Sequence, residues 1–437
     1  MDVAHCYLKG NADAVEFCPY DFYHNVLAVS TYTLQEGCQP NRHGSISLFN
    51  VDEDKRHLDM VFSEETAGIF DIKWSPPGGR LNPFLAQADA DGYLRIKMLE
   101  GCSNGVEGVN LKEITKEKIS NSMCLYLDWN PSATSITVGL SDGSVSIVSV
   151  LESKLEIQEQ WKAHDFELWT TCFDTHQPNL IYTGSDDCKF SCWDLRDRPP
   201  NVVFQSSKVH KMGVTCIEKS PHDPNILLTG SYDEFLRVWD LRSLSKPLNK
   251  TSISLGGGVW RVKQHPFIPG LVLAACMHNG FAIVAIKGDN AEVLETYNKH
   301  DSLAYGVDWH KGEANHLGGK TKPLMATCSF YDKHVRVWSL HASATGQKPH
   351  LLLLVLASHA SPHHFSSYAS ELRKILFVEL VNCCYDDKGI TGSSLVRLRR
   401  CVEEDHPSSS IGGGVSSFVK TQRRCKFISC GIKRGGF

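Results

Sequence analysis

The sequence lacks the features that place a chain in or across a membrane. The apolar run at residues 351–356 is far shorter than the ~20 residues that a membrane-spanning helix needs. Residues 1–5 also lack the basic start and the apolar centre of a secretory signal peptide. We therefore expect a cytoplasmic protein that makes no contact with a membrane.

The chain also has no excess of basic over acidic residues. The chain has 45 Lys and Arg residues against 49 Asp and Glu residues, a formal net charge of −4. Proteins that bind nucleic acid attract its phosphates with a basic surface, and here only the short stretch at 423–426 is locally basic. We expect no direct binding to nucleic acid.

The sixteen cysteines do not have the paired spacing of zinc fingers. Five of them fall within strand patterns, where a reduced thiol packs as a small hydrophobic group: Cys172, Cys192, Cys216, Cys276 and Cys328. Packed thiols fit the reducing cytosol. The sequence therefore predicts no metal site and no bound cofactor.

A repeated signature decides the fold class. Residues 184–187 lead to Trp193, residues 230–233 lead to Trp239, and residues 329–332 lead to Trp338. In each copy an Asp at the turn comes six residues before the Trp, and the copies are spaced by about one or two periods of roughly 46 residues. This length and these residues are typical of the blades of a WD-repeat β-propeller.

Weaker copies complete a ring of seven blades. Strand-turn-strand patterns occur at 88–96, 140–147 and 276–283, and a less regular N-terminal copy joins 26–29 to 46–49. We predict an all-β, seven-bladed propeller over residues 1–340, with residues 4–8 as the outer strand that closes the last blade. Residues 341–437 lack the blade pattern, and we expect an irregular, largely disordered tail.

Two blades contain the residues of a buried polar set. His164, Asp187 and Trp193 form one set, and His210, Asp233 and Trp239 form the other. We assign both to stability, because a hydrogen-bonded buried set is the ordinary role of such residues.

Two motif matches do not fit their usual chemistry. Residues 139–143 match the Gly-x-Ser-x-Gly pattern of hydrolases, but Ser141 falls in a strand-to-strand turn, whereas that nucleophile needs a turn from strand to helix. Residues 318–321 resemble a phosphate-binding loop, but no helix pattern follows them. We expect neither to be a catalytic site.

Several distinctive segments show a family resemblance, which covers roughly residues 10–340. They are 161–164, 229–234, 257–266, 273–278, 301–309 and 326–332. Together these segments resemble the WD-repeat diphthine methylesterase family of the diphthamide pathway. The resemblance implies hydrolysis of the methyl ester of diphthine, a modified histidine on translation elongation factor 2, with release of methanol. It supplies no catalytic motif to carry over.

The candidate substrate site is the propeller rim of blades four to seven, where aromatic residues gather. Its predicted substrate-binding residues are Trp169, Tyr232, Trp260, Tyr305 and Tyr331, with Phe166, Asp186 and Met212 beside them. Aromatic rings suit a substrate with a trimethylammonium group, since a desolvated cation–π contact contributes about 2 kcal/mol. For Trp169 and Trp260, ordinary strand packing is the alternative.

Ester hydrolysis needs a base and donors for the developing oxyanion. His278 is the candidate base, because Asn279 replaces the turn Asp of the sister blades, and Glu167 is the second candidate. Arg261, aligned with apolar Cys216, is the candidate oxyanion donor, with a salt bridge across blades as the alternative. Cys276 and Ser329 are weaker candidates for a nucleophile.

A second function class remains open from the sequence. Trp193 to Arg196 and Trp239 to Arg242 resemble the boxes by which some WD-repeat receptors dock onto cullin-based ubiquitin ligases. In that alternative the chain is a scaffold without catalytic activity and binds a ligase linker through Arg196 and Arg242.

Overall fold

The computed structural model of the 437-residue chain describes residues 1–36, 41–52, 55–78, 82–101, 108–152, 154–312 and 323–340. These residues all belong to one compact unit. The predicted tail at 341–437 and the glycine-rich stretch at 318–321 lie outside the described residues. Within the described ranges, no helix has the length and apolar character needed to cross a bilayer.

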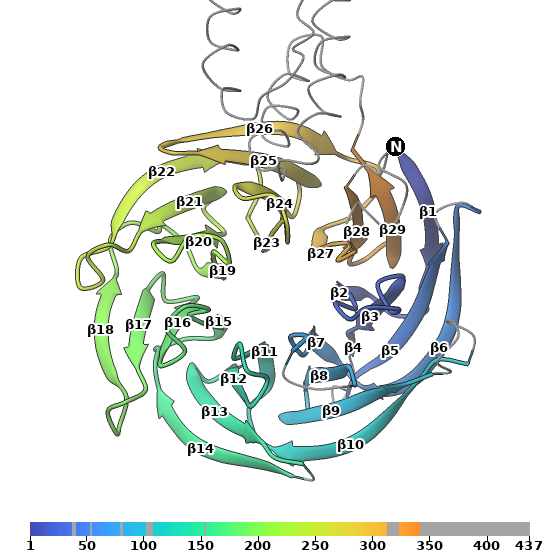
Figure 1. The fold of residues 1–437 in the computed structure, drawn as a ribbon, viewed down its shortest axis with the longest axis horizontal. Coiled ribbons are helices and arrows are strands. Elements are labelled where there is room, and N and C mark those ends of the chain that lie inside the picture. Colours follow the sequence, from blue (N-terminus) through green and yellow to red (C-terminus); the bar gives the residue numbers. More distant parts are fainter. Residues whose placement is uncertain are drawn as a thin grey trace, which may run out of the picture. The chain divides into compact units, whose positions relative to one another are not determined.

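Seven antiparallel sheets surround a central axis (Figure 1). The first blade contains β2 (Ala12–Phe17), β3 (Val26–Thr31), β5 (Asn41–Asp52) and β6 (His57–Ala67), with the short β4 (Thr33–Gln35) paired to β5. The second contains β7 (Ile69–Trp74), β8 (Phe84–Asp89), β9 (Tyr93–Glu100) and β10 (Asn110–Lys118). The third contains β11 (Cys124–Trp129), β12 (Ser135–Leu140), β13 (Ser144–Val150) and β14 (Leu155–Lys162).

The remaining blades repeat this order from the axis outwards. The fourth contains β15 (Leu168–Phe173), β16 (Leu180–Ser185), β17 (Phe190–Asp194) and β18 (Asn201–Ser206). The fifth contains β19 (Val214–Lys219), β20 (Ile226–Ser231), β21 (Phe235–Asp240) and β22 (Leu248–Ser254). The sixth contains β23 (Arg261–Gln264), β24 (Leu271–Ala275), β25 (Phe281–Lys287) and β26 (Asn290–Tyr297). The predicted seven-bladed, all-β propeller is confirmed.

The N-terminal strand closes the ring. The seventh blade contains β27 (Ala304–Trp309), β28 (Leu324–Ser329) and β29 (His334–Ser339), and its outer strand is β1 (Asp2–Tyr7). β1 pairs antiparallel with β29, with Tyr7 opposite His334. The two ends of the ring are therefore joined by strand hydrogen bonds, as the pattern at residues 4–8 predicts.

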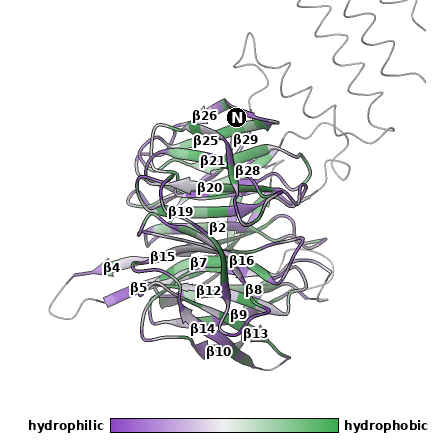
Figure 2. Cartoon of the chain, turned by 90° about the vertical axis from the view of Figure 1, so that its left-hand side faces the viewer, coloured by the Kyte–Doolittle hydropathy of each residue, from purple (hydrophilic) through white to green (hydrophobic). Residues whose placement is uncertain are grey.

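Burial is greater in the strands nearest the axis than in the outermost strands. Every residue of the innermost strand β2 is buried, whereas the outermost strand β14 is largely exposed along one face. The β4–β5 hairpin extends away from one face of the ring (Figure 2). Neighbouring blades pack their apolar faces together, so the core is a chain of clusters that runs around the ring.

The polar set of the fourth blade is hydrogen-bonded as predicted, with a threonine at its centre. The His164 Nδ1 atom lies 3.1 Å from Asp187, and its Nε2 atom lies 2.8 Å from the Thr183 hydroxyl. The Trp193 indole donates to the same hydroxyl at 2.8 Å. The sequence pattern did not reveal the threonine, because threonine is common in strands.

The prediction for the fifth blade was wrong in one respect. His210 and Trp239 share the Thr229 hydroxyl at 2.9 Å each, but Asp233 does not bond His210. Instead, the Nη1 and Nη2 atoms of Arg237 donate to the two carboxylate oxygens of Asp233 at 2.8 and 2.7 Å. A guanidinium can bind both oxygens of a carboxylate at once. The buried Nδ1 atom of His210 therefore has no partner among the described residues.

Substituting Thr229→Val tests the importance of this shared hydroxyl. The change leaves two buried ring nitrogens without a partner, and each such group costs about 1–3 kcal/mol. We expect the free energy of unfolding, measured in urea, to fall by about 2–4 kcal/mol. The matched variant Thr296→Val, on an exposed strand position, should change it by less than about 0.5 kcal/mol. Equal effects of the two variants would contradict the assignment.

Candidate active site

A β-bulge recurs at the second residue of the innermost strands. It occurs in six blades, at Asp13, Phe70, Leu125, Trp169, Thr215 and Tyr305. The corresponding residue of the sixth blade, Trp260, directly precedes β23. A bulge turns a side chain out of the regular alternation of the strand. Because all seven inner strands run alongside one axis, these side chains gather at one end of the central channel.

A pocket lies at this end of the channel. It is small and partly open to solvent. Its lining contains five of the six bulged residues, the equivalent Trp260, and two residues that directly follow such positions: Asp13, Phe70, Leu125, Tyr126, Trp169, Thr215, Trp260 and Arg261. The pocket is thus built by six blades and includes three of the predicted site residues.

Most of the predicted aromatic residues form one connected cluster. The ring centroid of Trp260 lies 5.5 Å from that of Trp169, 5.9 Å from that of Tyr232 and 4.9 Å from that of Tyr305, on which it stacks. Tyr305 continues the cluster to Phe330, which contacts Tyr331 edge-on at 5.0 Å. The structure thus brings together all five predicted substrate-binding residues, although Tyr331 lies at the exposed edge.

Arg261 forms a salt bridge across the channel. Its Nη1 atom donates to the Asp71 carboxylate of the second blade, and its guanidinium lies 5.2 Å from the centre of the Tyr126 ring. Burial alone would lower the pKa of Arg261, but Asp71 and Tyr126 raise it above the usual value, so the guanidinium stays charged. Its Nε atom is buried without a partner among the described residues. The alternative role predicted for Arg261 is therefore realised, and the residue still lines the pocket.

Asp13 is a buried carboxyl group that faces this pocket. Only 4% of the residue is exposed. Burial raises the pKa of Asp13 to about 8, although the Arg261 charge opposes the rise, and the neighbouring Asp71 adds to it. A carboxyl group with a pKa near neutrality is suited to proton transfer at physiological pH. Asp13 is therefore the strongest candidate for an acid or base in the pocket.

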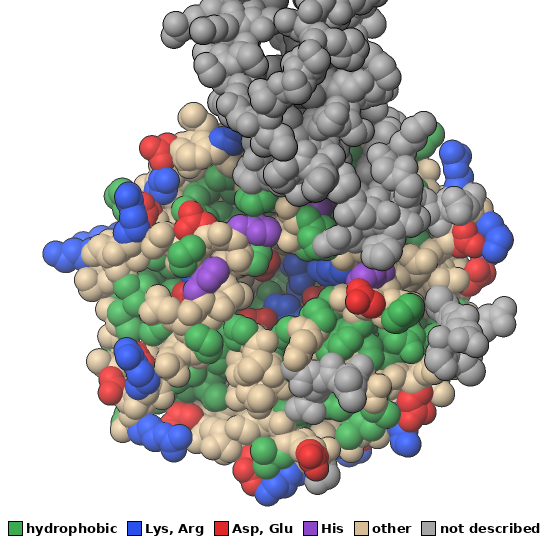
Figure 3. All heavy atoms as spheres, in the orientation of Figure 1, with side chains coloured by type: hydrophobic (Ala, Val, Ile, Leu, Met, Phe, Trp, Pro, Cys, Tyr) green, Lys and Arg blue, Asp and Glu red, His purple; other side chains and the backbone are tan. Residues whose placement is uncertain are grey.

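A layer of charged side chains lies further along the channel, at the fifth position of five inner strands and at the third position of the shorter β23. Its members are Glu16, Lys73, Asp128, Glu218, Lys263 and Asp308. The Lys73 ammonium lies 2.6 Å from Asp128, and that of Lys263 lies 2.9 Å from Glu16. Figure 3 looks onto one face of the ring, where acidic and basic side chains are visible in the central hollow.

The two candidate bases predicted from the sequence lie outside the pocket lining. His278 is exposed in the turn between β24 and β25, and its side chain has no bonded partner in the described part of the chain. Glu167 is half-buried and lies just before β15. The pKa of Tyr232 is raised mainly by burial, then by the charge of Asp186, and to a smaller extent by the charge of Glu167. Glu167 is thus close to the aromatic cluster, whereas His278 lies on a neighbouring turn.

The weaker candidates for a nucleophile are buried in the strands. Cys276 is fully buried, and burial raises the pKa of its thiol to about 12, which leaves it protonated and unreactive. Ser329 is also fully buried and donates to Asp332. Ser141 lies in the turn between β12 and β13, as the sequence predicts, and not at the start of a helix.

Reasoning from sequence missed Asp13, Tyr126 and Phe70, because only the rim of blades four to seven was considered. The sequence does contain a pattern that singles out Asp13. Aligning the seven inner strands places Asp13 at the position of Trp169 and Trp260, within an otherwise apolar stretch at residues 12–15. A carboxyl group at that position is the exception among seven repeats.

The comparisons with known proteins agree with this fold and point to one family. Residues 155–194 and 202–240 match the WD domain, G-beta repeat. A Dictyostelium discoideum protein named diphthine methyltransferase homolog is 34% identical over 371 aligned residues, which cover 76% of this chain and 97% of the relative. The chain belongs to the diphthine methyltransferase family.

Other members and one solved structure extend this result. The diphthine methyltransferase of Schizosaccharomyces pombe is 34% identical, with 74% of this chain and 94% of that protein covered. The human diphthine methyltransferase is also 34% identical, with 68% and 72% covered. A chain in the crystal structure of a mitotic checkpoint complex superimposes with a TM-score of 0.57 at 15% identity, over 77% of this chain and 91% of that chain, and shows the fold alone.

The adaptor alternative gains no support from these family members. The Arg196 and Arg242 side chains are 70% and 75% exposed, but each guanidinium bonds the Asp two residues before it, Asp194 or Asp240. Such a local pair fits a surface turn. The names of the relatives concern diphthine and not ubiquitin ligases.

The raised pKa of Asp13 makes a prediction for stability. In the unfolded chain this carboxyl group titrates near 3.8, and in the folded chain near 8. The contribution of protonated Asp13 to the free energy of unfolding is therefore fully present below about pH 4 and is lost as the pH rises towards 8. In urea at pH 8, Asp13→Asn should increase the free energy of unfolding relative to the unmodified chain, and at pH 4 the gain should disappear. A variant that is less stable at pH 8 would contradict the burial of an ionisable group here.

Proposed function

We propose that the chain hydrolyses the methyl ester of diphthine on translation elongation factor 2, a step of diphthamide biosynthesis. One observation supports this most strongly: a buried carboxyl group with a raised pKa shares a pocket with an aromatic cluster, in a chain of the diphthine methyltransferase family. Such a pocket offers both a proton acceptor and a binding site for a cationic group.

The aromatic cluster suits the trimethylammonium group of the substrate. A quaternary ammonium has no N–H to donate, so ring faces and negative charge are the groups that attract it. Trp169, Trp260 and Tyr232 provide the rings, and the Trp169 indole donates to Asp186 at 3.2 Å. The carboxylates of Asp186 and Glu167 act on Tyr232 and so place negative charge beside the cluster.

Asp13 supplies the base in this proposal. Its carboxylate takes a proton from water, the water oxygen bonds to the ester carbonyl carbon, and a tetrahedral oxyanion forms. The bond from that carbon to the methoxy oxygen then breaks, and methanol leaves with the proton that Asp13 returns. The product is the carboxylic acid, which releases its proton to water and becomes the carboxylate. No covalent enzyme intermediate is needed, which is consistent with the buried positions of Cys276 and Ser329.

Arg261 contributes through its charge. The guanidinium lowers the pKa of Asp13 from the still higher value that burial alone would produce. The same positive charge, in a poorly solvated site, favours the negative charge that develops on the oxyanion. Asp71 holds the guanidinium in place from the opposite blade, so Asp71 is a positioning residue.

The proposed reaction removes a methyl group, whereas the relatives' names describe a methyltransferase. The proposal of ester hydrolysis is supported by the resemblance of the sequence segments together with the chemistry of the pocket. The protein substrate follows from the same reasoning, because diphthine is part of elongation factor 2. We infer that the reaction takes place in the cytoplasm, where the factor acts.

Methanol release from methylated diphthine on elongation factor 2 tests the proposal. The full chain should release methanol, and kcat/KM should rise with pH towards about 8, where Asp13 becomes ionised. Asp13→Asn should lower kcat/KM by about 10²- to 10⁴-fold, the usual contribution of a general base. The matched control Asp21→Asn, with a side chain that is 89% exposed, should keep full activity. Full activity of Asp13→Asn would exclude this role.

The same assay compares the bases predicted from sequence. If Asp13 is the base, His278→Ala should retain most of the activity, and Glu167→Gln should mainly raise KM because it weakens attraction of the cation. Loss of activity in His278→Ala, with Asp13→Asn still active, would move the reaction to the turn between β24 and β25. Absence of methanol in every sample would contradict the hydrolase proposal itself.

A further inference from the structure

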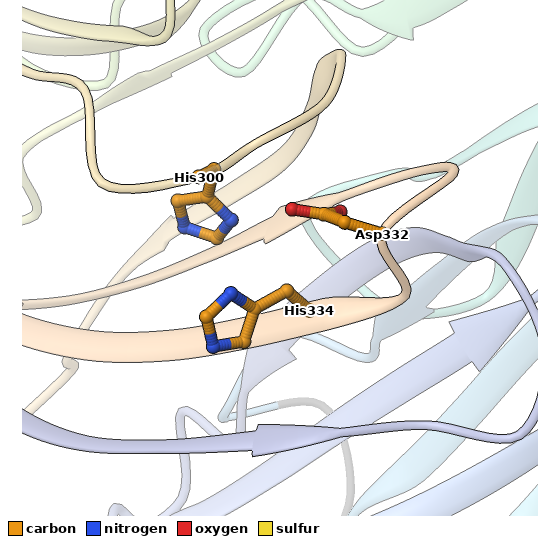
Figure 4. Close-up of side chains that lie close together, drawn as sticks. All are labelled: His300, Asp332 and His334. Carbon is orange, nitrogen blue, oxygen red and sulfur yellow. The ribbon is translucent and has the colours of Figure 1, made fainter.

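A second cluster of reactive side chains lies in the seventh blade, apart from the pocket. His300 precedes β27, Asp332 lies in the turn between β28 and β29, and His334 begins β29. One ligand atom from each residue lies within 4.8 Å of those of the other two. Figure 4 shows the two imidazole rings and the carboxylate directed towards a common point.

One ring nitrogen in this cluster lacks a partner. His334 is 1% exposed, and among the described residues its Nδ1 atom makes no hydrogen bond. Its Nε2 atom lies 3.2 Å from Nδ1 of His5 in β1. An unpaired polar atom in a buried position is unfavourable. A bound cation would give this nitrogen a partner.

The other atoms of the cluster are held by neighbours. The Nε2 atom of His300 lies 3.0 Å from the Thr327 hydroxyl, and its Nδ1 atom bonds the Ser329 hydroxyl, which in turn donates to Asp332. An ion bound through Nδ1 of His300 would therefore displace the hydrogen bond to Ser329. His334 is held by its ring stack on Tyr7, with centroids 4.2 Å apart. Metal-binding histidines usually have such a bonded second nitrogen, which fixes the ring orientation.

The sister blades show what is unusual here. His300 and Asp332 correspond to His164 and Asp187 of the fourth blade, so those two residues alone belong to the repeated structural set. The position of His334, two residues after the turn Asp, is occupied by Lys189 and Phe235 in the fourth and fifth blades. The histidine is therefore an addition that the blade architecture does not require.

We propose that His300, Asp332 and His334 bind one divalent transition-metal ion of the Zn²⁺ type. Two imidazoles and one carboxylate suit Zn²⁺ better than Mg²⁺ or Ca²⁺, which prefer oxygen ligands. Bond lengths of about 2.0–2.2 Å require the three ligand atoms to move closer together, and water can complete the tetrahedron. The spacing of the sequence did not reveal this site, because its ligands come from different segments of one blade.

The position of the site gives the ion a structural role. His5 belongs to the strand that closes the ring, and it holds the outer nitrogen of His334. A metal ion on the inner nitrogen would therefore connect β1 indirectly to the turn and the inner strand of the seventh blade. We expect the ion to stabilise the closure of the ring, and ester hydrolysis in the pocket does not depend on it.

Calorimetric titration of the metal-free full chain with Zn²⁺ tests this proposal. His334→Phe introduces the aromatic side chain found in the fifth blade and should remove one equivalent of bound Zn²⁺ relative to the unmodified chain. His5→Phe keeps all three ligands and should weaken binding at this site by about 10- to 100-fold. The number of Zn²⁺ ions bound by a variant is subtracted from the number bound by the unmodified chain, so binding to any other thiol or imidazole cancels.

The control is His57→Phe, an exposed histidine that lies 2.8 Å from Asp59 and represents surface binding. It should bind as much Zn²⁺ as the unmodified chain. Circular dichroism in the absence of metal checks that each variant is folded. If folded His334→Phe binds the same number of Zn²⁺ ions as the unmodified chain, or if Zn²⁺ raises the unfolding temperature of both equally, the site is not a metal site. If His334→Phe does not fold, His5→Phe decides, and unchanged affinity there overturns the proposal.

Discussion

The ring depends on polar side chains of the inner strands that hold the next blade. Asp308 accepts the backbone N–H of Phe17 at 2.8 Å, and Glu16 accepts that of Trp74 at 2.7 Å. The same bond recurs from Asp71 and Asp128 to the blades that follow them. Carboxylates buried in this way need both hydrogen bonds and opposite charges, and Lys263, Lys73 and Arg261 supply the charges from across or beside the channel. The seams between blades and the charged channel are therefore one structure.

This constraint also explains where the candidate active site lies. The inner strands are held by regular bonds along most of their length, and the pairing is interrupted by bulges only near their first residues. Side chains at the bulges are released from strand packing and meet at the end of the channel. Most blades place an aromatic or aliphatic residue there, and the first blade places Asp13. The surrounding rings remove water from its carboxyl group, so the same packing that binds a cation also tunes the proton acceptor.

The sequence predicted the number of blades and the inner strands, because both rest on a local pattern that repeats seven times. It also predicted the closing N-terminal strand, since the last blade otherwise lacks an outer strand. It also predicted the aromatic cluster, since Trp169, Trp260 and Tyr305 occupy equivalent repeat positions. It did not predict which partners the charged side chains bind. The Arg261–Asp71 pair joins residues 190 apart in the sequence. The Arg237–Asp233 pair lies within one blade, but the repeat pattern assigns Asp233 to His210 instead. The pKa of Asp13 likewise depends on burial by five other blades.

The central claim is that the pocket at the end of the channel binds the diphthine side chain. A crystal structure of the full chain with a peptide that carries diphthine tests it most directly. The account predicts that the trimethylammonium group contacts the rings of Trp169 and Trp260 and that the carboxylate end lies beside Asp13 and Arg261. Binding of the peptide beside His278, or on the opposite face of the ring, would contradict it.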